Sequence, residues 1–90
     1  MKTMEERRLL SSDIRLEILN RLTGGHWVTF TALWYSMGLN SGLAAHHLEK
    51  LAEAQFIIEE KRFVDRKPQT RYRITSNGKA ALARKFDSAP

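Results

Sequence analysis

The sequence predicts a single α+β domain, mainly helical, with a three-helix core, a β-hairpin and a C-terminal helix. Three observations support this prediction. Apolar residues recur at helical spacing in three separate stretches, and a side chain that can cap a helix precedes each of them. Residues 61–73 then hold six cations and one acid, a local net charge of +5 that equals the net charge of the whole 90-residue chain. This length fits one domain, so we predict one domain over residues 1–90.

The first helix is predicted to begin after Ser11-Ser12-Asp13, because short polar side chains are good N-caps. Its apolar residues recur at helical spacing, and they are Ile14, Ile18, Leu19 and Leu22. Thr23-Gly24-Gly25 is expected to end this helix, since glycines stop a helix at little cost. A short extended piece is then expected at Trp27-Val28.

Two further helices are predicted on either side of a tight turn. Thr29 caps the second helix and Gly38 closes it, with Leu39 filling the turn. The apolar residues of the second helix are Phe30, Leu33 and Met37. Asn40 caps the third helix. An α-helix turns by about 100° per residue, which places three of its apolar residues on one face: Ala44, Leu48 and Leu51. His47 lies at the edge of this face.

A β-hairpin is predicted next, with strands over residues 56–64 and 70–74. The second strand alternates polar and apolar residues, which is typical of a half-buried strand. Pro68-Gln69 is expected near the tip, in a loop that holds Arg66 and Lys67. Thr75 or Ser76 then caps a last helix through Phe86, and residues 87–90 are expected to fray.

Three helices and a basic hairpin in this order define a winged helix-turn-helix. The predicted core consists of Ile14, Ile18, Leu19, Leu22, Phe30, Leu33, Met37, Leu39, Ala44, Leu48, Leu51, Ile58, Tyr72 and Ile74.

Composition excludes several classes of protein. The absence of cysteine removes disulfides and thiolate metal ligands and fits a reducing, intracellular setting. No apolar run has the length of a signal peptide or a membrane span, so a cytoplasmic protein without membrane contact is expected. The sequence has no phosphate-cradling glycine loop, no nucleophile with a base and no paired carboxylates. We therefore expect no enzymatic activity and no cofactor.

Three runs of the chain resemble the winged-helix transcriptional regulators of the MarR/ArsR type, most of all the small archaeal and bacterial winged-helix DNA-binding subgroup. These runs are Phe30–Leu33, Gly38–Gly42 and His47–Ala54. Residues 63–75 are similar to the wing of that subgroup and residues 76–80 to the start of its final helix. The resemblance covers about residues 12–86 and implies a homodimeric, sequence-specific repressor or activator without enzymatic activity.

Two features depart from the family pattern. Gln55 follows the third helix where the family usually has glycine, so this residue must adopt or avoid a left-handed conformation. The third helix is also less basic than most recognition helices, which argues against strong base readout through arginine.

The predicted DNA-binding surface combines the third helix with the hairpin. The helix, about residues 40–53, would enter the major groove. Its predicted contact residues are Ser41, Gly42, Leu43, Ala45, His46 and Lys50. The wing, residues 61–73, would contact the DNA backbone and minor groove. Its predicted contact residues are Arg62, Arg66, Lys67, Arg71 and Arg73. Two plainer interpretations are a solvated helix face and a hairpin edge that charge protects from aggregation, although protection needs fewer than six cations.

Histidines and aromatic residues allow further interpretations. Adjacent helical side chains diverge by about 100°, so His46 and His47 are poorly placed to bind one metal ion, and no metal is predicted. His47 is expected to be partly buried and hydrogen-bonded to backbone. Three aromatic residues would either line an effector pocket or serve packing or dimer contacts, and they are Trp27, Trp34 and Tyr35. One side chain of Trp34-Tyr35 must face outward.

The two ends of the chain, residues 1–11 and 76–90, are predicted to mediate homodimerisation. They carry apolar residues for which the core has little room: Met4, Leu9, Leu10, Ala81, Leu82 and Phe86. A dimer would bury this surface and present two recognition helices about 34 Å apart, one turn of DNA. The alternative is a monomer whose last helix packs on its own core.

We therefore predict a dimeric transcriptional regulator that binds double-stranded DNA. The competing hypothesis is a winged-helix protein-interaction module whose basic hairpin docks an acidic partner. RNA binding is less favoured, because the third helix and the wing lack the exposed aromatic residues that stack on unpaired bases. The sequence does not indicate an operator or an effector.

Overall fold

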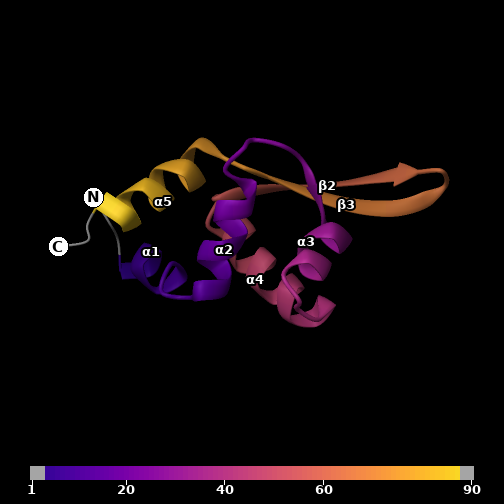
Figure 1. The fold of residues 1–90 in the computed structure, drawn as a ribbon. Helices are drawn as coiled ribbons and strands as arrows, with labels where there is room; N and C mark the ends of the chain where they lie inside the picture. Colours follow the sequence, from indigo (N-terminus) through magenta and orange to yellow (C-terminus); the bar gives the residue numbers. More distant parts are fainter. Residues whose placement is uncertain (1–3, 88–90) are drawn as a thin grey trace.

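Helices gather around one end of an antiparallel sheet, and a long hairpin projects from the other end, in the computed structural model (Figure 1). The structure describes residues 4–87. Its elements are α1 (Met4–Leu9), α2 (Asp13–Leu22), β1 (Val28–Thr29), α3 (Phe30–Ser36), α4 (Ser41–Glu53), β2 (Ile57–Val64), β3 (Lys67–Ile74) and α5 (Ser76–Asp87). The strand order is β1-β3-β2, so β3 lies between its two partners. Within the described residues, no helix is long and apolar enough to span a bilayer.

The predicted helix starts are confirmed by hydrogen bonds in which a side-chain oxygen accepts from a backbone N–H three residues later. The pairs are Ser12 with Arg15 at 3.3 Å, Thr29 with Ala32 at 3.1 Å, Asn40 with Leu43 at 2.7 Å and Thr75 with Gly78 at 3.0 Å. Thr75, and not Ser76, therefore caps α5. Short polar side chains at these four positions set where α2, α3, α4 and α5 begin.

The core lies where α2, α4 and α5 meet the base of the sheet. The predicted residues that are buried there are Ile18, Leu19, Leu22, Leu33, Ala44, Leu48, Leu51, Tyr72 and Ile74. Four others are only partly buried: Ile14, Phe30, Met37 and Leu39. The prediction is wrong for Ile58, which is 44% exposed, because Ile57 takes the inward position. Neighbouring residues of a strand face opposite sides, so only one of this pair can enter the core.

The N-terminal helix α1 was not expected from the sequence. It packs beside α5 at the end of the molecule away from the hairpin (Figure 1). The carboxylate of Glu6, which is 8% exposed, accepts two hydrogen bonds from Arg84 at 2.6 and 3.0 Å. This bidentate pair joins the first and the last helix.

The terminal helices also fill the core more fully than the sequence suggested. Leu10, Ala81 and Leu82 are buried in the protomer, with exposed fractions of 1%, 0% and 6%. The expectation that the core has no room for these three side chains is wrong, because α1 and α5 close over α2 and the sheet. Leu9 packs at the edge of the same core.

Gln55 adopts the left-handed conformation that its position after α4 requires, with φ 63°. The Phe56 N–H donates to the carbonyl of Leu51 at 3.0 Å, a helix-ending bond that needs this conformation. Gln55 and Phe56 then hold the start of α5. The Gln55 carbonyl accepts from the Thr75 hydroxyl at 2.7 Å, and the Phe56 carbonyl accepts from the Thr75 N–H at 3.0 Å.

The hairpin turn is tighter than the predicted loop. Only Asp65 and Arg66 connect the strands, and both have positive φ angles, 52° and 67°. Lys67 lies in β3 opposite Val64, and Pro68 and Gln69 also belong to that strand. Two central residues with φ above zero are typical of a type I′ turn, whose twist matches that of the flanking strands. The predicted loop that includes Lys67 is therefore wrong, and Arg66 alone of the two cations occupies the turn.

Candidate nucleic-acid interface

The apolar residues of α4 fix which side of this helix meets solvent. Ala44, Leu48 and Leu51 are buried against the core, so the opposite side is left exposed. The predicted contact residues on the exposed side are Ser41, Gly42, Leu43, Ala45 and His46. Lys50 is partly buried, and its ammonium group lies 3.7 Å from the carboxylate of Glu53. The exposed N-terminal half of α4 thus presents small, apolar and imidazole side chains.

Pairing between β2 and β3 assigns every hairpin side chain to one of two faces, because directly paired residues share a face. The inner face continues from the buried residues Tyr72 and Ile74, and it contains Ile57, Glu59, Lys61, Phe63, Pro68, Thr70, Tyr72 and Ile74. The outer face contains Ile58, Glu60, Arg62, Val64, Lys67, Gln69, Arg71 and Arg73.

The exposed side of α4 adjoins the inner face of the hairpin. A surface depression is lined by Ala45 and Glu49 of α4 together with Lys61 of β2 and Thr70 of β3. A rod-like partner seated on α4 would therefore meet the inner face, where the Lys61 ammonium group lies 3.7 Å from the Glu59 carboxylate. The sequence prediction did not single out Lys61, although the alternation of strand residues places it on the same face as Tyr72.

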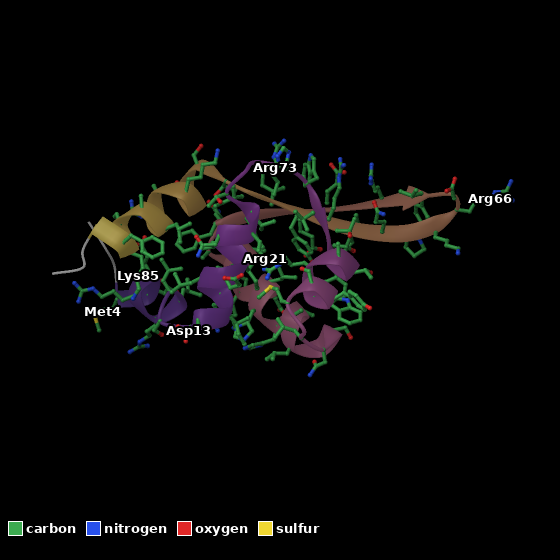
Figure 2. All side chains as sticks on the ribbon, in the orientation of Figure 1. Met4, Asp13, Arg21, Arg66, Arg73 and Lys85 are labelled. Atoms are coloured by element: carbon green, nitrogen blue, oxygen red, sulfur yellow. The ribbon has the colours of Figure 1, made fainter. Side chains whose placement is uncertain are left out.

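The structure does not bring all the predicted wing cations to this side. Arg62, Lys67, Arg71 and Arg73 lie on the outer face. Figure 2 shows Arg73 on the side of the hairpin away from α3 and α4. The charged run therefore divides into two surfaces that point in different directions.

Two of the outer arginines are held by neighbours. The Arg62 Nε donates to Gln69 Oε1 at 2.9 Å across the strands. Arg71 binds the Glu60 carboxylate through two nitrogens, at 2.6 and 2.7 Å, and its side chain is only 21% exposed. Arg71 therefore has less capacity to bind a phosphate than its charge suggests.

The wing tip carries the cations with the fewest contacts. Arg66 lies at the free end of the hairpin, far from the helices (Figure 2). Arg66 and Lys67 are both exposed, and within residues 4–87 neither side chain has a hydrogen-bond or ion-pair partner. Arg66 also occupies a left-handed position that favours glycine. Arg66 thus combines an exposed cation with a conformation that costs energy for residues other than glycine.

His47 differs from its prediction, because its partner is a side chain and not backbone. The Nε of Arg15 on α2 donates to His47 Nδ1 at 3.0 Å, so this ring nitrogen carries no proton. Arg15 also reaches the Leu9 carbonyl at 3.5 Å. Burial lowers the pKa of His47 below 6.5, and the charges of Arg15 and His46 lower it further. The neutral imidazole therefore links α4 to α2.

We expect the pH dependence of stability to reveal this link. Because the folded protein binds the His47 proton less readily than the unfolded chain, stability should rise with pH up to about 6.5 and gain nothing more from this group above it. Thermal melts of the wild type and of His47→Gln between about pH 5 and pH 8 test this. The variant should show a shallower slope below pH 6.5. Equal slopes in the two proteins would exclude His47 as the titrating group.

Other contacts bear on the metal-site and aromatic interpretations of the sequence. Among the described residues, no group of three potential ligands is arranged to hold a metal ion. The ring centroids of Trp34 and Tyr35 on α3 lie 6.1 Å apart in an edge-to-face arrangement. Tyr35 is 77% exposed, which confirms that one of the pair faces outward. Trp27 instead contacts the guanidinium groups of Arg71 and Arg73.

A family model described as a winged helix DNA-binding domain matches residues 14–88. Among solved structures, the chain is similar to a transcriptional regulator homologue from Pyrococcus horikoshii OT3, with 24% identity and a TM-score of 0.76. This match covers 96% of this chain and 90% of that one. No curated protein sequence matches the chain significantly.

Two other solved structures are also similar to the chain. Apo MarR from E. coli is 14% identical with a TM-score of 0.71, over 89% of this chain and 62% of that one, so this chain spans less than two thirds of MarR. The homodimeric winged helix-turn-helix DNA-binding domain (fragment 1–100) of Mb0332 from Mycobacterium bovis, a possible ArsR-family regulator, is 23% identical with a TM-score of 0.69. This match covers 92% of this chain and 69% of that one. The chain belongs to the winged helix DNA-binding domain family, and its fold is of the MarR/ArsR-like type.

Proposed function

We propose that this protein regulates transcription by binding a specific site in double-stranded DNA. The exposed side of α4 would lie in the major groove, and the wing tip would contact the backbone and the adjacent minor groove. The observation that carries this proposal is the shared side of the two elements. The depression between Ala45 and Lys61 joins the exposed side of α4 to the inner face of the hairpin, and the turn extends beyond it with the unpaired cation Arg66.

Each part of this surface has a distinct role in the proposal. Gly42, in the first turn of α4, has open space where a side chain would be, with only the Asn40 carboxamide oxygen nearby, so the sugar-phosphate backbone can approach closely. Leu43 and Ala45 suit contact with thymine methyl groups, and His46 suits a hydrogen bond to a guanine acceptor. Ser41 at the helix start suits a base edge or a phosphate. Lys61 and Arg66 would contact phosphates, which position the protein without reading sequence.

A duplex titration at two salt concentrations tests the proposal. We expect binding of a random duplex at low salt and a steep loss of affinity as salt rises, because phosphate contacts release counterions. The absence of any binding at low salt would contradict the proposal and favour the protein-interaction hypothesis.

Replacing His46 should alter site preference and leave phosphate contacts intact. We expect His46→Ala to change the set of duplexes selected from a random pool, with a base discrimination loss of about 1–3 kcal/mol at one position and an unchanged salt slope. Selection and sequencing with the wild type and the variant measure this. An unchanged selected motif would show that His46 does not face the bases.

We also propose that two copies associate through the ends of the chain. Of the residues predicted for this role, Met4 and Phe86 are 68% and 59% exposed, on the adjacent helices α1 and α5. Sedimentation should show a dimer for the wild type and a shift toward monomer for Met4→Lys/Phe86→Lys, because two charges would replace apolar contact area. Tyr35→Lys on α3, where the side chain is 77% exposed, is the matched control and should remain dimeric. A monomeric wild type would contradict this proposal.

A further inference from the structure

The outer face of the hairpin, which we call the outer wing face, carries most of the hairpin's positive charge. It holds four cations against one acid, Glu60, which is already paired with Arg71. Protection of a sheet edge does not explain the charge at Arg71. At Arg71 the strand β3 is paired on both sides, with Thr29 of β1 and with Glu60 of β2, so no open edge exists there.

Trp27 forms a platform beneath two of these cations. The guanidinium carbon of Arg71 lies 4.2 Å from the centroid of the indole ring, and that of Arg73 lies 4.8 Å from it. Stacking on an aromatic ring attracts a guanidinium group and limits its rotation. Arg71 is further fixed by Glu60, whereas Arg73 has no hydrogen-bond or ion-pair partner within residues 4–87. Arg73 is thus oriented with its N–H groups free to bind an anion.

The cations also follow a line. Every second residue of β3 lies on the outer face, and three of these four residues are cations: Lys67, Arg71 and Arg73. At about 3.3 Å per residue, the line from Lys67 to Arg73 extends about 20 Å. Arg62 lies beside this line on β2. A strand of duplex DNA presents one phosphate per 3.4 Å along its axis, so a line of this length can meet several phosphates. An extended row of guanidinium and ammonium groups fits such a repeating anion better than one acidic side chain.

We propose that the outer wing face binds a second segment of duplex DNA through its phosphates, so that one protein molecule joins two duplex segments. A duplex seated on α4 meets the inner face, and Arg73 points away from α4 (Figure 2), so the outer face remains accessible in that complex. This inference rests on the proposed function for the first duplex. The second contact is independent of sequence, because only phosphates are engaged.

Energy transfer between two duplexes tests the inference. One duplex carries a donor and the other an acceptor, and anisotropy of each duplex measures its binding separately. With wild-type protein at low salt we expect both binding and energy transfer. Arg62→Gln/Arg73→Gln should abolish most of the energy transfer and lower the salt slope of the second binding step by about 2, with the first step retained. Lys61→Gln/Arg66→Gln removes the same charge from the other surface and should weaken the first step.

Each other outcome overturns a defined part of the account. Absence of energy transfer with normal binding of one duplex would refute the second surface and leave the proposed function standing. Transfer that persists in Arg62→Gln/Arg73→Gln would show bridging by two recognition helices of a dimer, and equal losses in both double variants would show an effect of net charge alone. Binding of polyglutamate to the wild type but not to Arg62→Gln/Arg73→Gln, without bridging, would assign the face to an acidic protein. Loss of all duplex binding would refute the proposed function itself.

Trp27 offers an independent readout of the same face. The chain has two tryptophans, so Trp34→Phe leaves Trp27 as the only one. In that variant, fluorescence should change during the second binding step and not during the first, because Arg73 stacks on Trp27 and would shift toward a phosphate. A change confined to the first step would overturn the assignment of the second duplex to this face.

Discussion

Gly78→Ala should destabilise the protein more than any other single methyl addition to its glycines. A methyl group at Gly78 would press into the carbonyl of Phe56 and lie 2.8 Å from Ile74 Cγ1. This carbonyl belongs to the backbone and already accepts the Thr75 N–H, so it has little freedom to move. We expect a loss of about 2–3 kcal/mol, the upper range for overpacking, and a melting temperature lower by roughly 10–20 °C. Thermal and denaturant unfolding measure both quantities.

Gly42→Ala is the matched control, since it adds the same methyl group to another helix. The new atom would have only the Asn40 Oδ1 nearby, at 3.5 Å. Because alanine favours helix over glycine, we expect stability to stay equal or rise by up to about 1 kcal/mol. Comparable stability of the two variants would show that α5 does not dock on Phe56 as described.

Arg66→Gly should change stability and DNA binding in opposite directions. Glycine accepts φ 67° without cost, so the turn should gain about 1 kcal/mol in stability. The same change removes the exposed cation at the wing tip. Affinity for every duplex should therefore fall, and the salt slope should decrease by about 1. Denaturant unfolding and duplex titrations at several salt concentrations provide the two measurements.

Arg66→Ala separates the two effects. Alanine keeps the conformational cost of the left-handed position but lacks the charge. This variant should bind DNA as weakly as Arg66→Gly while showing stability close to that of the wild type. If Arg66→Gly binds duplexes as well as the wild type does, the wing tip has no part in the interface.

Local features of the sequence predicted the fold well. Thr29 and Asn40 set the starts of α3 and α4, because a cap depends on residues only three positions away. Strand alternation was harder to use. Ile58 was assigned to the core one position away from Ile57, since an apolar pair does not reveal which member faces inward.

Contacts between distant residues could not be predicted in the same way. Arg84 binds Glu6 from 78 residues away, and no local pattern connects them. The partner of His47, Arg15, lies 32 residues earlier in the chain. The hairpin that carries the cations was predicted correctly. The alternation of strand residues around the buried Tyr72 divides the cations between two faces. A count of the charges along residues 61–73 does not show this division.

Chemical-shift mapping of the backbone amides on addition of duplex DNA tests the central claim most directly. At the first equivalent of duplex, we predict the largest changes at Ser41–His46, Lys61 and Asp65–Lys67, and little change in α1 and α5. Unperturbed amides of α4 at saturation, together with shifted amides of α1 and α5, would contradict DNA binding through α4.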